Sequence, residues 1–221
     1  MGDSTVQKLL ALAEELASKQ TDSELNKAAD ILLHLINTGC EDPEILVRAA
    51  TYLLQGPRRS EFSIKQKAIS LVDKVVALSP DNISVLEKAL ACYELTLNDF
   101  PEKLNIIVRL ALKILEIDPD HIEAMITLAY HREHPCVALS LADTIRMLEW
   151  AREVEPDNFY VSFSLARLYI EAGKYNLANS QFQQVLANSE PDSWEALDAG
   201  YKIKFLHSKS KIKRHPKYGF N

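Results

Sequence analysis

The densest group of side chains able to bind a metal ion lies near the middle of the chain. It consists of His131, His134 and Cys136, with His121 a short distance before them. Imidazole and thiolate groups are the donors that zinc prefers, so the spacing His-x-x-His-x-Cys is compatible with a zinc site. Pro135, however, breaks any helix between the donors, and no fourth donor stands at a defined spacing. We therefore interpret this stretch as a solvated turn between helices and predict no metal site.

Acidic residues gather in short turns, for example at Asp118, Asp120 and Glu123. These turns recur about every 37 residues, each with a proline, whereas a general acid–base pair would occur once. Carboxylates at such places are typical of helix N-caps, where they meet the positive end of the helix dipole. The motifs GxGxxG, GxxxxGK[ST], GxSxG and HExxH are missing from the sequence. We predict a protein that is not an enzyme and uses no cofactor.

The charge of the chain is unevenly distributed. The first 198 residues carry 18 Lys and Arg against 31 Asp and Glu, whereas the last 23 carry seven basic residues and no acidic one, within a net charge of -6. The basic residues of this tail are Lys202, Lys204, Lys209, Lys211, Lys213, Arg214 and Lys217. Such a segment is suited to anionic lipid, RNA or an acidic protein surface, and it is also typical of a solubilising tail.

The remaining composition favours a soluble protein of a reducing compartment. Cys40, Cys92 and Cys136 lie more than about 40 residues apart, which argues against a disulfide framework. The first residues lack the pattern of a secretory signal, and no apolar run reaches the roughly 18 residues that a membrane span needs. We expect a cytoplasmic protein, with contact to a membrane surface through the basic tail left open.

A proline within an acidic or polar turn marks a repeating unit along the chain. It recurs at Asp42-Pro43, Ser79-Pro80-Asp81-Asn82, Asp118-Pro119-Asp120-His121, Glu155-Pro156-Asp157-Asn158 and Glu190-Pro191-Asp192-Ser193, with proline spacings of 37, 39, 37 and 35. Proline cannot sit inside a helix, whereas Asp, Asn and Ser are good N-caps. Each turn is therefore predicted to end one helix and begin the next.

Between these turns the apolar residues recur with spacings of three and four, the pattern of an amphipathic helix. Each interval is broken once near its middle, for example at Gly56-Pro57 and Gly173-Lys174. The sequence thus predicts an all-α protein of five helix pairs and a final helix. The expected ranges are 3–19, 22–38, 43–55, 62–78, 82–98, 101–117, 121–133, 138–154, 158–172, 175–188 and 192–207.

The interval after Pro156 resembles a tetratricopeptide repeat. The residues at the family's consensus positions are Leu165, Ala166, Tyr169, Gly173, Tyr175, Ala178, Phe182 and Val185, with Pro191 one place late. The other intervals keep parts of the pattern, and the first pair is assigned by periodicity. The resemblance implies an α-solenoid of about five repeats, at 3–42, 43–81, 82–120, 121–157 and 158–191. It would be completed by a capping helix at 192–207 and a flexible tail at 208–221.

Such a family binds a partner peptide in a groove lined by the first helix of each pair. The resemblance places in this groove Ile126, Thr127, Tyr130, Tyr160, Phe163, Ser164, Arg167 and Glu171, joined by Glu87, Lys88 and Ala91 of an earlier repeat. Aromatic residues with one arginine suit a peptide that has an apolar anchor and a carboxylate. The alternative is that Tyr160 and Phe163 belong to the core between repeats. The lysine and asparagine clamp of chaperone-binding members is missing here, apart from Arg167.

The functional prediction is a non-catalytic adaptor or assembly scaffold that binds another protein and no small-molecule substrate. The alternative is a peripheral protein held on anionic membrane or RNA by the basic tail, with the solenoid as a spacer. Self-association is a third possibility, because an open solenoid ends in apolar faces. Trp194, Leu197, Tyr201 and Phe205 are expected to cap one end, and a cluster of N-terminal leucines could join two copies at the other.

Overall fold

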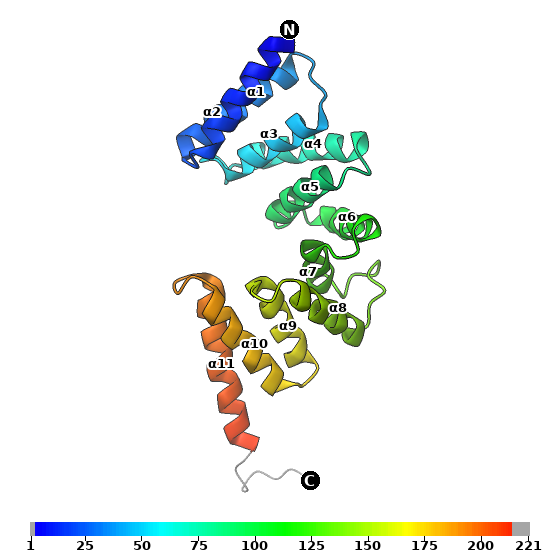
Figure 1. The fold of residues 1–221 in the computed structure, drawn as a ribbon, viewed down its shortest axis with the longest axis vertical. Helices are drawn as coiled ribbons and strands as arrows, with labels where there is room; N and C mark the ends of the chain where they lie inside the picture. The colour runs from blue at the N-terminus through cyan, green and yellow to red at the C-terminus, as the bar shows by residue number, and fades with distance from the viewer. Residues whose placement is uncertain (1–2, 214–221) are drawn as a thin grey trace. The chain divides into compact units, whose positions relative to one another are not determined.

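A computed structural model describes the backbone of residues 3–213 and the side chains of residues 4–206. Within that part the chain has eleven α-helices, one short 3-10 helix and no strand (Figure 1). The α-helices are α1 (Asp3–Ser18), α2 (Asp22–Asn37), α3 (Pro43–Gln55), α4 (Phe62–Leu78), α5 (Ile83–Thr96), α6 (Leu104–Ile117), α7 (Ile122–Tyr130), α8 (Leu141–Val154), α9 (Phe159–Glu171), α10 (Tyr175–Asn188) and α11 (Trp194–Lys213), and η1 (Pro101–Lys103) precedes α6. The predicted all-α class and the number of helices are confirmed.

The boundaries of α8 and α11 differ from the prediction. α8 begins at Leu141, a turn later than expected, because the Ser140 hydroxyl accepts a hydrogen bond from the N–H of Asp143 at 3.1 Å and caps the helix. α11 begins at Trp194 and continues to Lys213, beyond the expected end at residue 207.

The proline-containing turns begin helices through side-chain caps, as predicted. Asp42 Oδ1 accepts from the N–H of Glu44 at 2.8 Å, and Pro43 occupies the first turn of α3, where a missing N–H costs nothing. Asn82 caps α5 and Asn158 caps α9 in the same way, accepting from backbone N–H groups at 3.0 to 3.3 Å. Because a cap recurs at these turns, the first helix of each repeat begins at a defined residue.

The acidic residues of these turns also hold the second helix of their own repeat, which the sequence did not indicate. In three repeats a donor on the second helix reaches back to the turn: Lys74 to Glu41 at 2.7 Å, Lys113 to Asp81 at 2.9 Å, and Trp150 Nε1 to Asp120 Oδ1 at 2.8 Å. Exposed pairs of this kind add little stability. Their recurrence shows that each of these three turns contacts the second helix of its own repeat.

The chain divides into two compact units, residues 1–117 with α1 to α6 and residues 118–221 with α7 to α11. Within each unit consecutive helices pack side by side, and first helices also contact one another, α3 with α5 and α7 with α9. Fully buried alanines occupy these contacts, among them Ala28, Ala50, Ala89 and Ala111 in the first unit and Ala124, Ala151, Ala166 and Ala178 in the second. Small side chains let the helix backbones approach closely.

Two buried tyrosines, 76 residues apart, join neighbouring repeats in the same manner. The hydroxyl of Tyr93 on α5 donates to Asp73 on α4 at 2.6 Å, and that of Tyr169 on α9 donates to Glu149 on α8 at 2.5 Å. Burial, followed by this hydrogen bond, raises the pKa of Tyr169 to about 12. The consensus tyrosine therefore contributes a polar contact as well as volume.

Replacing Tyr169 with Phe tests this contact. The variant keeps the ring but loses a hydrogen bond to a carboxylate, so the free energy of unfolding should fall by about 1–2 kcal/mol. Urea titration followed by circular dichroism measures the change. Tyr201→Phe is the matched control, because the exposed Tyr201 ring should leave stability within about 0.5 kcal/mol. Equal stability of Tyr169→Phe and the wild-type chain would show that the bond contributes nothing.

Candidate functional site

Most of the predicted groove residues lie on the first helices α7 and α9 of the second unit, whereas Glu87, Lys88 and Ala91 lie on α5 of the first unit. Tyr130 and Tyr160 are exposed, and Ile126 and Ser164 are partly buried. The guanidinium of Arg167 stacks on the ring of Tyr130, with its carbon 5.1 Å from the ring centre. The structure thus brings Tyr130 and Arg167 together on one surface.

Two of the predicted groove residues are already engaged within the protein. Phe163 is only 8% exposed, and its ring packs edge-on against Phe182 at 5.9 Å and against Trp194 at 5.4 Å between ring centres. The carboxylate of Glu171 pairs with Arg132 of the turn after α7. Phe163 therefore supports the surface from beneath, which agrees with the core alternative, whereas Tyr160 does not.

The largest exposed apolar side chains of this surface come from α11 and were not assigned to it by the sequence. Trp194, Leu197 and Tyr201 are 62%, 64% and 67% exposed, and Phe205 is also exposed. They follow Tyr160, Phe163, Arg167 and Glu171 of α9 at a constant interval of 34 residues. We name the exposed residues Tyr130, Tyr160, Arg167, Trp194, Leu197, Tyr201 and Phe205 the aromatic face.

The exposure of these α11 residues follows from the way the helix packs. α11 packs against α10, and its buried residues include Ala196, Ala199 and Leu206, which lie on the side opposite the exposed stripe. The helix does cover α10, as expected of a cap. The residues proposed for that role, however, point away from α10. A helix with apolar residues on two opposite sides was the signal that sequence reasoning missed.

Two open hollows flank the aromatic face at the N-terminal end of α9. The rings of Phe159 and Tyr160 pack 4.1 Å apart between them. One hollow, of ≈ 500 Å³, is lined by the end of α10, the turn after it and the start of α11; the other, of ≈ 550 Å³, is lined by Glu123 and the turn before α9. Both are wide open to solvent, so they are surface hollows that can receive single side chains.

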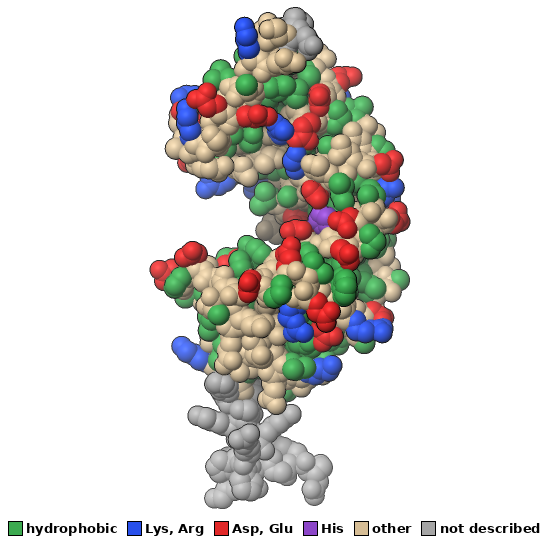
Figure 2. Space-filling model, in the orientation of Figure 1, with side chains coloured by type: hydrophobic (Ala, Val, Ile, Leu, Met, Phe, Trp, Pro, Cys, Tyr) green, Lys and Arg blue, Asp and Glu red, His purple; other side chains and the backbone are tan. Residues whose placement is uncertain are grey.

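Carboxylates dominate the edge of the aromatic face at these hollows. Glu123, Glu155, Asp157, Glu190 and Glu195 line them, and acidic side chains are seen over the turn between α10 and α11 (Figure 2). In the part of the chain described, none of the five pairs with a lysine or arginine. Glu155 accepts a hydrogen bond from Asn158 at 2.8 Å, and Glu123 lies 3.7 Å from His121. Burial and the carboxylate of Glu195 raise the pKa of Tyr160.

The corresponding face of the first unit is occupied by its own ion pairs. Arg48 on α3 pairs with Glu14 on α1 and donates through Nε to Glu44 at 2.9 Å, and Glu44 also pairs with Lys88 on α5. Burial would raise the pKa of Glu44, but hydrogen bonds from Lys88 and Arg48 hold it below its usual value. This ladder links three first helices and includes no exposed aromatic ring, so the two units differ in the surface they offer.

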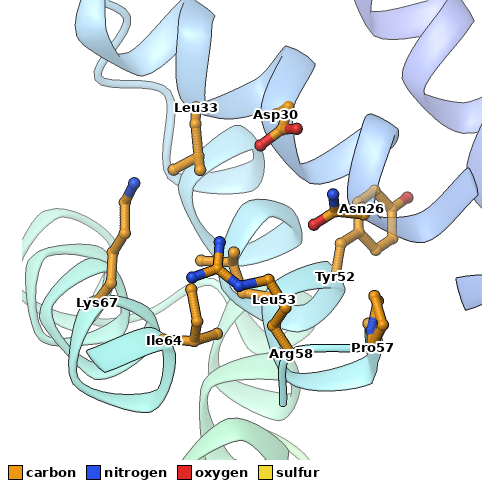
Figure 3. A pocket seen from close by; sticks show the side chains of 10 residues that line it. Asn26, Asp30, Leu33, Tyr52, Leu53, Pro57, Arg58, Ile64 and Lys67 are labelled. Carbon is orange, nitrogen blue, oxygen red and sulfur yellow. The ribbon is translucent and has the colours of Figure 1, made fainter. Parts of the chain in front are cut away.

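The first unit also contains a small cavity (Figure 3). It lies among α2, α3 and α4, with Asn26 and Asp30 on one side and Arg58 and Lys67 on the other. Its volume is ≈ 80 Å³, well below the roughly 300 Å³ of small-molecule sites. Arg58 is also held by two hydrogen bonds to Glu61 at 2.7 Å. The cavity suits water better than a ligand.

The histidines and cysteine of the predicted turn have structural contacts. His121 Nδ1 accepts from the N–H of Ala124 at 3.2 Å and caps α7, while His134 Nδ1 accepts from the N–H of Cys136 at 3.2 Å. No cluster of three metal ligands occurs among the described residues. Burial, followed by repulsion from His134, lowers the pKa of His131.

The side chains of the predicted basic tail lie mainly outside the part that the structure describes. Lys202 and Lys204 belong to α11, and Lys209, Lys211 and Lys213 fall in the same helix, although their side chains are not described. Arg214 and Lys217 lie outside the described residues. No described helix is long and apolar enough to span a bilayer.

Comparison with known proteins places the fold. A search of protein-family models and one of curated protein sequences gave no match. Among solved structures, MamA from Desulfovibrio magneticus RS-1 is similar with a TM-score of 0.62 at 16% identity, covering 85% of this chain and 96% of that one. A thermophilic TPR protein of Thermus thermophilus has a TM-score of 0.59 at 16% identity, with 92% and 99% covered. The chain has a tetratricopeptide-repeat fold, as its sequence predicted.

The lowered pKa of His131 predicts how stability responds to acid. The unfolded chain binds a proton at His131 more readily than the folded one, so the free energy of unfolding should fall as the pH drops below the ordinary pKa of about 6.5. His131→Gln should lose part of this decline. Urea titrations of both proteins at pH 7.5 and 5.5 give the comparison, and an identical decline in the two would contradict the prediction.

Proposed function

We propose that this tetratricopeptide-repeat fold is a non-catalytic scaffold that binds a peptide segment of another protein on its aromatic face. The observation that carries the proposal is the exposed apolar stripe of α11. Trp194, Leu197 and Tyr201 remain more than half exposed although they lie on a helix whose other side is packed. Contiguous exposed apolar residues rimmed by polar ones are typical of protein-interaction sites.

The chemistry of the face is that of an interaction hot spot. Tryptophan, tyrosine and arginine contribute most to binding at protein interfaces, because they combine large apolar area with a polar group. Here α7 contributes Tyr130, α9 contributes Tyr160 and Arg167, and α11 contributes Trp194 and Tyr201. A bound segment that crosses all three helices would bury these rings together and find Arg167 available for a carboxylate.

The contrast between the two units supports this location. At corresponding positions the first unit has Glu44, Arg48 and Lys88, which satisfy one another. A partner would have to break these ion pairs before gaining contacts of its own. The aromatic face needs only the release of water from apolar surface, which favours association.

Introducing a charge at Leu197 tests the proposal. Peptides that bind the full chain are first selected from a random dodecapeptide library displayed on phage. They should bind the Leu197→Asp variant at least tenfold more weakly than the wild-type chain, a loss of about 1.4 kcal/mol in binding free energy. Fluorescence anisotropy of the synthetic peptides gives the affinities. Because Leu197 is exposed, circular dichroism should show an unchanged helical content.

Leu177→Asp is the matched control for this test. Leu177 is 47% exposed on α10 of the same unit but belongs to a second helix, outside the aromatic face. Its replacement should leave peptide affinity within about twofold, less than 0.5 kcal/mol. Equal losses in the two variants, or none in Leu197→Asp, would place the binding site elsewhere.

A further inference from the structure

We infer that the segment bound on the aromatic face carries basic side chains, arginine above all, at the edge where the two hollows lie. This inference rests on the proposed function and specifies its partner. The sequence alone pointed to a carboxylate-bearing peptide through Arg167. The carboxylates around Phe159 and Tyr160 favour a positive charge on the bound segment at a different part of the face.

The edge at the two hollows carries a negative charge that the described chain does not balance. Five carboxylates line the hollows, four of them on exposed residues and the fifth on the buried Glu195, and no lysine or arginine of the described residues lines either hollow. In two turns of the first unit, by contrast, an acidic residue is neutralised from the second helix, Glu41 by Lys74 at 2.7 Å and Asp81 by Lys113 at 2.9 Å. At this edge the equivalent neutralisation is missing, so a partner with positive charge would gain attraction without displacing an internal cation.

An aromatic pair lies between the hollows. Phe159 and Tyr160 form a ridge with a hollow on each side, and both residues line both hollows. A guanidinium or ammonium group in either hollow would meet a ring as well as carboxylates. Cations favour the face of an aromatic ring, and arginine gains further because its planar group stacks on the ring while it forms paired hydrogen bonds to a carboxylate.

This edge is continuous with the exposed stripe of α11. Tyr160 belongs both to the aromatic face and to the two hollows, and Glu195 follows Trp194 at the start of α11. One segment can therefore place apolar side chains on Trp194 and Leu197 while its basic side chains enter the hollows. A partner that combines both properties fits better than a purely apolar or purely basic one.

The composition of peptides selected by the full chain is the first readout. Lys and Arg should be enriched beside large apolar residues, and the affinity of a selected synthetic peptide should fall as salt rises, because exposed charges are screened. Selected peptides that are enriched in neutral or acidic residues, and whose binding does not depend on salt, would overturn the inference.

Paired charge reversals are the second readout. Glu155→Lys with Glu190→Lys changes one carboxylate in each hollow, both in turns, and should weaken the selected peptide at least tenfold. Glu153→Lys with Glu102→Lys changes the net charge equally at exposed positions outside the hollows and should leave affinity within about threefold, less than 1 kcal/mol. Equal losses of peptide affinity in the two double variants would show that only the net charge of the protein matters, which would overturn the inference.

Failure of this inference is distinguishable from failure of the proposed function. If the wild-type chain selects no peptide, both the proposed function and this inference are contradicted. Peptides lost with Leu197→Asp but unaffected by Glu155→Lys with Glu190→Lys would leave the function standing without a basic partner. Sedimentation velocity provides the last outcome: a wild-type dimer that Leu197→Asp converts to a monomer would show that a second copy covers the face, which also overturns the inference.

Discussion

Everything in this fold depends on the fact that a single amphipathic helix pair cannot bury its apolar side chains alone. Each pair is completed by the next, which explains why buried alanines such as Ala166 and Ala178 recur at the contacts between helices. The same requirement applies to the last helix. α11 packs through Ala199 on one side and leaves Trp194 and Tyr201 exposed on the other.

The two units meet this requirement alike but use their first helices differently. In the first unit, Glu14, Arg48, Glu44 and Lys88 connect α1, α3 and α5 through ion pairs. In the second unit the corresponding surface carries aromatic rings and Arg167, and few of its charged side chains form ion pairs. One face is thereby completed internally, and the other retains apolar surface and an acidic edge. The proposed function follows from that difference and not from the fold alone.

The sequence was sufficient to predict the helices because proline turns, caps and three–four spacing are local signals. Asn82 and Asn158 cap their helices within three residues, so no distant contact was needed. The hydrogen bond of Tyr169 to Glu149 and that of Trp150 to Asp120 were not predictable, because each joins two helices or a helix and a distant turn and depends on their packing.

The candidate site was predicted only in part, for the same reason. Tyr160 and Arg167 were found through the family resemblance of one closely matching repeat. Leu197 and Tyr201 were assigned to a cap, because a stripe of apolar residues on a terminal helix indicates burial until the packed side of the helix is known. The buried Ala199 shows which side of α11 is packed, because it lies opposite the exposed stripe. Likewise the carboxylates of the turns, Glu123 among them, were interpreted as caps, and only the structure places several of them along one edge.

The solvent exposure of Trp194 in the free and bound chain tests the central claim most directly. With Trp150 replaced by Phe, acrylamide quenching reports Trp194 alone, because the chain has two tryptophans. We expect ready quenching in the free protein and strong protection when a selected peptide saturates it. Quenching of Trp194 that stays unchanged at saturation would contradict the claim that a partner binds on α11.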